Sequence, residues 1–185
     1  AVSRKRGIGG IRCELVIPNR EVQDVYRFEI LDKMRGRFSV SRLETMFDDL
    51  LSGNGKAFSE LLGGYLRDLV SVYDTANKES FYHGFVLGMT ALFVSDYIIE
   101  SNRESGYGRF DLAIIPKDVS KAGVIMEFKV ASREADMAAK AKEALQQIEE
   151  REYVTEFRQR GIQRVWKYGI AFCGKKILAF QGPMC

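Results

Sequence analysis

The spacing of apolar residues changes along the chain. In the first half they recur every three or four positions, a period that predicts amphipathic helices. From residue 97 onward, runs of β-branched and aliphatic residues between turn residues predict strands. We expect helices at residues 19–34, 41–53, 56–73, 75–93 and 134–151, and strands at residues 13–17, 97–102, 109–115, 123–130, 164–172 and 176–180. This order of elements predicts an α/β protein.

Charged residues stand in two of these strands. Asp111 lies in GRFDLAII, and Glu127 and Lys129 lie in GVIMEFKV. Because side chains alternate across a strand, Glu127 and Lys129 point to one face and Phe128 to the other. If the hairpin turns about Val119, Asp111 pairs opposite Glu127 on that face. The Cβ atoms of the two residues are then roughly 5 Å apart, so the carboxylates repel each other unless a cation lies between them.

A hard divalent ion is the natural cation for such a carboxylate pair, because carboxylate oxygens are preferred ligands of Mg²⁺. Lys129 follows one side chain further along the same face. At that place its ammonium group could orient a water molecule or offset charge that develops on a phosphoryl group.

An Asp followed about fifteen residues later by Glu-x-Lys resembles the motif of the PD-(D/E)XK nuclease superfamily. The strings ESFYHGFVLGM, SNRESGYGRFD, IMEFKV and EALQQIEEREY are similar to one branch of it, the nuclease-like domain that commonly follows an AAA-type ATPase domain. The resemblance covers roughly residues 17–180. One departure is Phe110, which precedes the Asp where the namesake motif has Pro.

The resemblance implies a restriction-endonuclease-like fold with an αβββαβ core. That core would occupy residues 74–185, after a strand and a helical N-terminal extension at residues 1–73, in one compact domain overall. The resemblance also implies roles for single residues. The catalytic residues would be Glu79, Asp111, Glu127, Lys129 and Gln147, and the ligands of Mg²⁺ or Mn²⁺ would be Asp111, Glu127, Glu79 and the carbonyl of Phe128.

The long helix expected at residues 134–151 leaves one choice open. Its apolar stripe is formed by Ala138, Ala141, Leu145 and Ile148. Gln146 and Gln147 both fall outside this stripe, so periodicity does not decide between them. The resemblance alone selects Gln147, whose role would be to bind a phosphate oxygen or a metal-bound water; otherwise it is a solvated glutamine.

Other residues near the expected site also keep two interpretations. Glu79 and His83 are four residues apart and share one helix face. His83, the only histidine, is either part of the site or a polar residue satisfied at the edge of the core. Tyr153 and Trp166 could stack on bases. We favour a place in the core or at its rim for both, because aromatic side chains are commonly buried.

Composition sets the frame for this site. With 185 residues and 46% hydrophobic residues, the chain can bury a core, which excludes a disordered protein. A net charge of +3 permits nucleic-acid binding without demonstrating it. Basic clusters are candidate phosphate contacts, although the usual role of such clusters is a solvated surface. They are Arg4, Lys5 and Arg6; Arg158, Arg160 and Arg164; and Lys175 with Lys176.

Several features bear on where the protein acts. The apolar stretch at residues 81–99 carries His83 and Asp96, so we expect a buried helix that runs into a strand rather than a membrane span. No signal peptide is recognised at the first residues. The three cysteines suggest no disulfide partner; they are Cys13, Cys173 and Cys185. We therefore expect a cytoplasmic protein. Because it begins with Ala rather than Met, we expect a piece of a longer chain.

The expected function is that of a metal-dependent nuclease that hydrolyses phosphodiester bonds, with a DNA endonuclease favoured. The alternative is a catalytically silent module that binds nucleic acid or dimerises beside an ATPase domain. The presence of all the expected acidic residues argues against a catalytically silent module. A surface used only for binding would gain phosphate affinity by losing its carboxylates. A homodimer would use the helices between residues 21 and 73. The residues do not distinguish DNA from RNA, or single from double strands.

The chain itself is not expected to hydrolyse ATP. Its GNGK string at residues 53–56 superficially resembles a phosphate-binding loop. However, Ala57 stands where Ser or Thr would bind magnesium, and Leu50 stands where the first Gly of the motif would be.

Overall fold

The computed structural model describes residues 2–7, 10–15, 40–71, 79–90, 93–102, 104–105 and 108–185. The chain divides into two compact units, Ala1–Val40 and Ser41–Cys185. In the first unit, β1 (Val2–Gly7) and β2 (Gly10–Leu15) pair as an antiparallel hairpin. The helix predicted at residues 19–34 lies outside the described residues.

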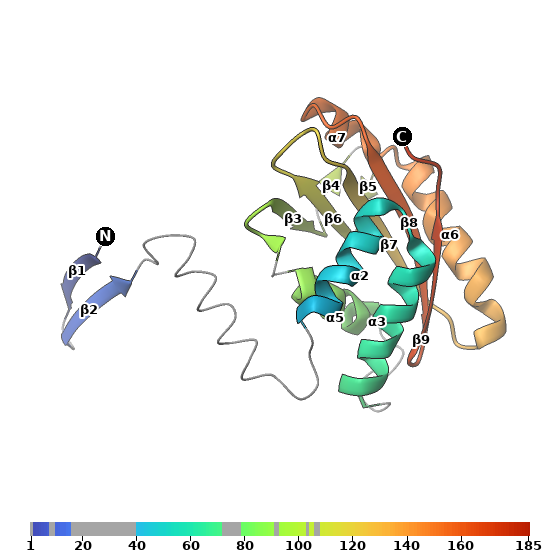
Figure 1. Cartoon of the computed structure of the whole chain (residues 1–185), viewed down its shortest axis with the longest axis horizontal. Coiled ribbons are helices and arrows are strands. Elements are labelled where there is room, and N and C mark those ends of the chain that lie inside the picture. Colours follow the sequence, from blue (N-terminus) through green and yellow to red (C-terminus); the bar gives the residue numbers. More distant parts are fainter. Residues whose placement is uncertain are drawn as a thin grey trace. The chain divides into compact units, whose positions relative to one another are not determined.

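A five-stranded sheet forms the centre of the second unit (Figure 1). Its strands, in spatial order, are β3 (Tyr97–Ser101), β6 (Leu112–Pro116), β7 (Gly123–Val130), β8 (Val165–Cys173) and β9 (Lys176–Gln181). Neighbouring strands are antiparallel except for β7 and β8, which are parallel. A parallel pair needs a crossover connection. Here it contains the helices α6 (Met137–Glu150) and α7 (Val154–Gln159).

Helices cover both faces of the sheet. The helix α6 packs on β7 and β8 from one side. On the opposite side, Tyr82 of α5 (Glu79–Thr90) stacks on Phe172 of β8, with ring centroids 4.3 Å apart. On that side also, Tyr168 donates a hydrogen bond of 2.7 Å to the Leu50 carbonyl of α2 (Val40–Ser52), and α3 (Gly55–Leu69) packs on β9. Because both faces are covered, β6 is a continuous buried apolar run.

The predicted α/β class is confirmed, and most element ends lie within a few residues of their predicted positions. The strand predicted at residues 123–130 coincides with β7. The stretch at residues 81–99 contains the end of α5 and the start of β3, as expected for a buried helix followed by a strand. The strand predicted at residues 109–115 is different. It is divided between the two-residue strand β5 (Gly108–Arg109), which pairs with β4 (Glu104–Ser105), and β6.

The apolar stripe of α6 differs from the predicted one at two positions, where the buried residue is the one before the predicted residue. The buried residues of the helix are Met137, Ala141, Ala144 and Ile148. Ala138, which we placed in the stripe, is exposed, and Leu145 is only partly buried. The helix contains several alanines, and their small side chains give little information on which side of a helix faces the sheet.

The close approach of α6 to the sheet depends on Gly169 of β8. A Cβ atom at this position would overlap the main-chain oxygen of Ala141 and the main-chain nitrogen of Leu145. Gly169 is also the register partner of Glu127 in the parallel β7–β8 pair. The absence of a side chain therefore lets the backbone of α6 come down onto the sheet next to Glu127.

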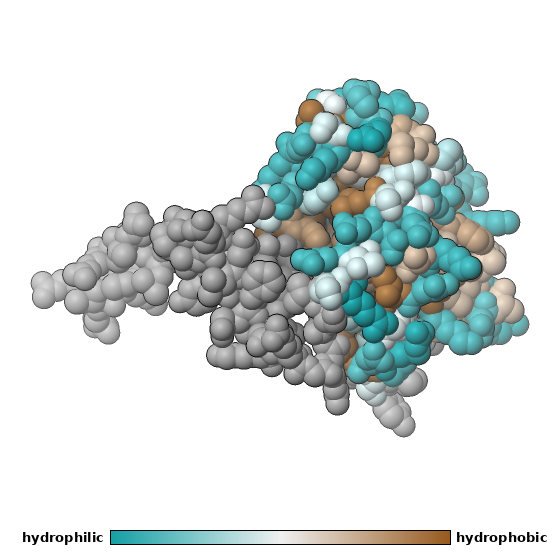
Figure 2. Space-filling view, in the orientation of Figure 1, coloured by the Kyte–Doolittle hydropathy of each residue, from teal (hydrophilic) through white to brown (hydrophobic). Residues whose placement is uncertain are grey.

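The visible surface of the second unit is mainly hydrophilic, and its apolar residues form separate patches (Figure 2). Among the described residues, the large hydrophobic side chains that remain exposed are Val94, Ile98, Val119 and Met184. Within the same residues, no helix combines the length and apolar character that crossing a membrane requires.

Candidate active site

Asp111 lies in a bend immediately before β6 rather than inside a strand. Its main-chain oxygen accepts a hydrogen bond of 3.0 Å from the Asn102 N–H. Its Oδ2 accepts a hydrogen bond of 2.8 Å from the Phe128 N–H. The Phe128 N–H of β7 therefore bonds the side chain of Asp111 and not a main-chain oxygen of the neighbouring segment. For this reason the strand predicted from residue 109 starts only at Leu112.

The predicted turn about Val119 is confirmed by the register of β6 and β7. Leu112 pairs with Met126, and Ile114 pairs with Val124. One step further, the same register places Asp111 level with Glu127. Asp111 itself is outside the strand, but its carboxylate accepts from the N–H of Phe128, the neighbour of Glu127, and its charge acts on Glu127.

Glu127 is a buried carboxylate in β7, with only 2% of its surface exposed. Its Oε1 lies 3.4 Å from the Lys129 Nζ and accepts a hydrogen bond from the side-chain amide of Gln147. Its Oε2 is buried and has no hydrogen-bond partner within the described part of the chain. The pKa of Glu127 is raised to about 7, mainly because the carboxyl is buried and also because of the charge of Asp111; Lys129 opposes the shift.

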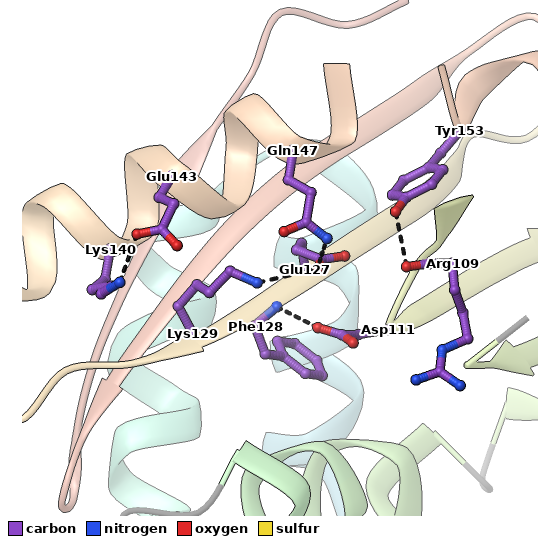
Figure 3. A network of polar contacts seen from close by, with 9 residues as sticks. All are labelled: Arg109, Asp111, Glu127, Phe128, Lys129, Lys140, Glu143, Gln147 and Tyr153. Atoms are coloured by element: carbon purple, nitrogen blue, oxygen red, sulfur yellow. Dashed lines mark hydrogen bonds and ion pairs between the residues drawn. The ribbon is translucent and has the colours of Figure 1, made fainter. Parts of the chain in front are cut away.

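Figure 3 shows how these side chains are arranged: Glu127 and Lys129 point towards α6, and Phe128 points to the other side of β7. The predicted alternation is therefore confirmed. The Lys129 side chain is mostly buried, with 18% of its surface exposed. Its ammonium group lies beside Glu127, and Asp111 is near both residues (Figure 3).

Glu79 approaches this group from the first turn of α5. Its side chain is exposed, but neighbouring atoms remove enough water to raise the pKa of its carboxyl. Lys129 lowers this pKa, and Asp111 and Glu143 raise it. Coulombic effects fall off with distance, so Glu79 lies in the neighbourhood of Lys129, Asp111 and Glu143.

Gln147, and not Gln146, reaches the site. Gln147 donates its amide hydrogen to Glu127, whereas Gln146 is exposed and bonds Glu150 on its own helix at 2.6 Å. The contact with Glu127 differs from the phosphate or water contact that we expected for Gln147. Glu143, one turn earlier on α6, also faces this region and pairs with Lys140 at 2.7 Å (Figure 3).

The two aromatic candidates for base stacking have structural contacts. Tyr153 is buried, donates a hydrogen bond of 2.8 Å to the Arg109 carbonyl, and meets the Phe110 ring edge-on. Trp166 donates a hydrogen bond of 2.9 Å to the Leu51 carbonyl. The preference for core or rim positions is therefore confirmed. Through Arg109 and Phe110, Tyr153 also holds the chain just before Asp111, which nothing in the sequence indicated.

Most of the basic clusters are engaged within the protein. Arg160 contacts Glu100 at 2.8 Å and also pairs with Glu156. Lys176 pairs with Glu134, and Lys175 and Arg164 donate to main-chain carbonyls. The cluster at residues 4–6 lies in β1, outside the residues whose side chains are described. Sequence clusters of positive charge therefore do not by themselves outline a nucleic-acid surface.

The donor set can be tested against a metal ion. Among the described residues, no three His, Cys, Asp or Glu side chains are grouped so that they could hold a metal by themselves. Asp111 and Glu127 supply two neighbouring carboxylates. Glu127 Oε2 is a buried acceptor without a hydrogen-bond partner among the described residues. This set fits Mg²⁺ or Mn²⁺, because Mg²⁺ is usually bound by one or two carboxylates together with waters and substrate phosphates.

The candidate site lies apart from a cavity on another part of the second unit. A cavity of about 660 Å³ lies elsewhere, between α3, β9 and the start of α6, and none of the residues discussed above as catalytic lines it. The carboxylates and Lys129 instead lie where β6 begins and β7 ends, between the ends of α5 and α6.

Comparison with known proteins agrees with this geometry. A family model described as the PD-(D/E)XK nuclease superfamily matches residues 77–181, which is more than half of the chain. The matched range includes every residue that we predicted to be catalytic. A search of the curated proteins found no match.

Proposed function

The chain belongs to the PD-(D/E)XK nuclease superfamily, and from this membership we propose that it is a metal-dependent nuclease that hydrolyses phosphodiester bonds, with DNA as its favoured substrate. The observation that carries the proposal is the buried Glu127 carboxylate, whose Oε2 has no partner among the described residues and which lies beside Asp111 and Lys129. A carboxylate kept in this state is destabilising by itself, because desolvation disfavours its charge. A bound cation would remove that cost.

Asp111 and Glu127 are the proposed ligands of a divalent ion, with the Phe128 carbonyl and Glu79 assisting. Superfamily members typically use divalent metals. When bound, such an ion supplies a water of lowered pKa and neutralises charge on the scissile phosphate. Asp111 is held for this role by the Phe128 N–H, which donates to its Oδ2.

Lys129 and Gln147 are the proposed partners of this pair. The Lys129 ammonium, 3.4 Å from Glu127 Oε1, would orient the attacking water and offset the negative charge that grows on the phosphoryl oxygens. Gln147 donates to the same Oε1. It would therefore hold the Glu127 side chain in one orientation, with Oε2 as the oxygen that the ion would bind.

The order of elements supports the restriction-endonuclease-like αβββαβ core. In chain order, α5, β3, β6, β7, α6 and β8 supply a helix, three strands, a helix and a strand. The helices α2 and α3 precede them and would form the N-terminal extension. The boundary near residue 73 stays a prediction, as does an ATPase domain upstream.

A cleavage assay tests the proposal. The purified chain is incubated with circular and linear duplex DNA, single-stranded DNA and RNA, each in Mg²⁺, Mn²⁺, Ca²⁺ or EDTA. We expect cleavage in Mg²⁺ or Mn²⁺, no cleavage in EDTA, and cutting of circular DNA if the enzyme is an endonuclease. The double substitution Asp111→Asn with Glu127→Gln is the negative control, because it keeps side-chain size and removes both charges.

The outcomes separate the functional classes. Cutting of linear but not circular duplexes would replace the endonuclease by an exonuclease. Cleavage of RNA alone would change the substrate class. If no nucleic acid is cut under any condition but the chain still binds one of them, the catalytically silent binding module takes the place of the nuclease.

A further inference from the structure

His83 contacts the site residue Asp111 from α5. The ring nitrogen Nε2 lies 3.0 Å from the main-chain oxygen of Asp111 and 3.0 Å from the Ser101 Oγ at the end of β3. His83 is half-buried, one helical turn after Glu79. The same face of α5 therefore presents a carboxylate to the site and an imidazole to the backbone of the site.

The contact with the main-chain oxygen of Asp111 requires one tautomer of the imidazole. A main-chain carbonyl only accepts hydrogen bonds, so His83 bonds Asp111 in the tautomer that carries the hydrogen on Nε2; the side-chain amide nitrogen of Asn102 also lies 3.4 Å from Nε2. The Ser101 hydroxyl oxygen is within reach of the same hydrogen as a second acceptor. The ring also packs near Phe128, with centroids 6.0 Å apart, which limits its rotation.

Asp111 needs such contacts because it lies in a bend outside the strand ladder. Three elements hold it. His83 of α5 and the Asn102 N–H, after β3, both donate to its main-chain oxygen, and the Phe128 N–H of β7 donates to its carboxylate. Asn102 has a positive φ of 52°, a left-handed conformation that few residues adopt. With this backbone conformation, the N–H of Asn102 points at the main-chain oxygen of Asp111.

We propose that His83 is a positioning residue, which acts through the main-chain carbonyl of Asp111 to aim the carboxylate at the divalent ion. This inference rests on the proposed nuclease function. The carbonyl and carboxylate of Asp111 belong to one residue, so a rotation of its backbone redirects the side chain. Groups that orient metal ligands typically change metal affinity or activity by roughly 10–100-fold when they are removed.

Three substitutions at residue 83 separate hydrogen bonding from packing. His83→Gln carries an N–H donor at about the reach of Nε2, and His83→Asn carries one at the shorter reach of Nδ1. His83→Leu fills similar space without a donor. Ser80→Ala, at an exposed position on the same helix, is the matched control.

Two readouts are needed, and the first is independent of catalysis. Mn²⁺ binding is measured by calorimetry in the presence of a non-cleavable oligonucleotide. We expect His83→Leu and His83→Asn to weaken binding about tenfold, and His83→Gln to restore most of it. The second readout is cleavage, where we expect kcat to fall by roughly 10–100-fold in His83→Leu while KM changes little.

The inference is overturned if His83→Leu binds Mn²⁺ like the wild type, or if Gln and Leu lose binding equally and lower the melting temperature equally. Either result would leave His83 as a packing residue. The failure of the proposed function looks different: the wild type would bind Mn²⁺ through Asp111 and cleave nothing. In that case the binding series still decides the role of His83.

Discussion

Gln147 of α6 donates its side-chain amide hydrogen to Oε1 of Glu127 in β7, and the Oε2 of the same carboxylate is buried without a partner among the described residues. One oxygen is thus fixed by the protein, and the other is the one that the proposed cation would bind. Each half of this arrangement can be perturbed by a different substitution.

Replacing Gln147 tests the hydrogen bond that holds Oε1 of Glu127. We expect Gln147→Ala to reduce cleavage about tenfold or more, because Glu127 loses the donor that orients it. Gln146→Ala is the matched control, one residue away on the exposed side of α6, and should cleave like the wild type. Single-turnover cleavage at saturating metal measures both. Equal losses in the two variants would mean that the helix, and not the contact, is being perturbed.

Removing the carboxylates of Asp111 and Glu127 tests their proposed role as metal ligands. We expect Asp111→Ala and Glu127→Ala to abolish cleavage, because each removes a proposed metal ligand. Nucleic-acid binding in Ca²⁺ should survive or strengthen, since affinity comes mainly from Lys and Arg contacts with phosphates and a lost carboxylate relieves repulsion. Gel shifts beside cleavage assays measure the two effects. Full cleavage by either variant would move the catalytic centre elsewhere.

Lys129→Ala should reduce cleavage by about 10²-fold or more, as for the loss of one preorganised group that stabilises developing charge. It should also change the pH profile. Lys129 lowers the pKa of Glu127, so its loss raises that pKa and moves the acidic limb of the pH–rate curve to higher pH. Lys129→Arg keeps the charge and should keep the limb in place. An unchanged limb in Lys129→Ala would argue against coupling between these residues.

The raised pKa of Glu127 also predicts a pH-dependent stability of the metal-free protein. The folded state favours the protonated carboxyl, so its contribution is fully present below about pH 4.5 and is lost as the pH rises through about 7. In EDTA, Glu127→Gln should therefore be more stable than the wild type at pH 8, by up to roughly 3 kcal/mol. The difference should vanish near pH 4. Urea unfolding across this range measures it.

A matched substitution controls that stability experiment. Glu150→Gln removes a carboxyl from the exposed side of α6 and should change stability little at either pH. If Glu127→Gln shows the same difference from the wild type at pH 4 and at pH 8, the carboxyl does not titrate as described.

Arg160 is expected to support the fold rather than the substrate. Its guanidinium contacts Glu100 and Glu156, and all three side chains are largely buried. Arg160→Ala should destabilise the protein by about 1–3 kcal/mol, because the carboxylates lose a charged donor. Its affinity for nucleic acid should stay the same. Thermal unfolding and gel shifts measure these effects, with the exposed Arg158→Ala as control; a large loss of affinity without destabilisation would restore Arg160 as a phosphate contact.

The sequence predicts the strand pair of the site well, because the two-residue period of a strand and the length of the hairpin define its register. Leu112 opposite Met126 follows from a turn about Val119. The same pattern misses the bend at Asp111. Whether a residue at the end of an apolar run pairs through its backbone or through its side chain depends on the donors of the neighbouring strand, here the Phe128 N–H.

Contacts between distant elements are the part that periodicity does not supply. Gln147 and Gln146 differ by one position on a helix whose alanines give little directional signal, so only the packed structure orients them towards or away from Glu127. His83 and Asp111 are 28 residues apart, and their contact depends on where α5 rests against the sheet. No local pattern encodes that placement.

The position of α6, and with it that of Gln147, depends on the missing side chain of Gly169. Because α6 rests where a Cβ would otherwise be, a single methyl group in Gly169→Ala would lift the helix and draw Gln147 away from Glu127 without altering any charge or reactive group. The rate of cleavage should then depend on the size of the side chain at residue 169 alone: the larger this side chain, the farther α6 would be displaced and the lower the rate would be. A search restricted to polar residues would overlook this position.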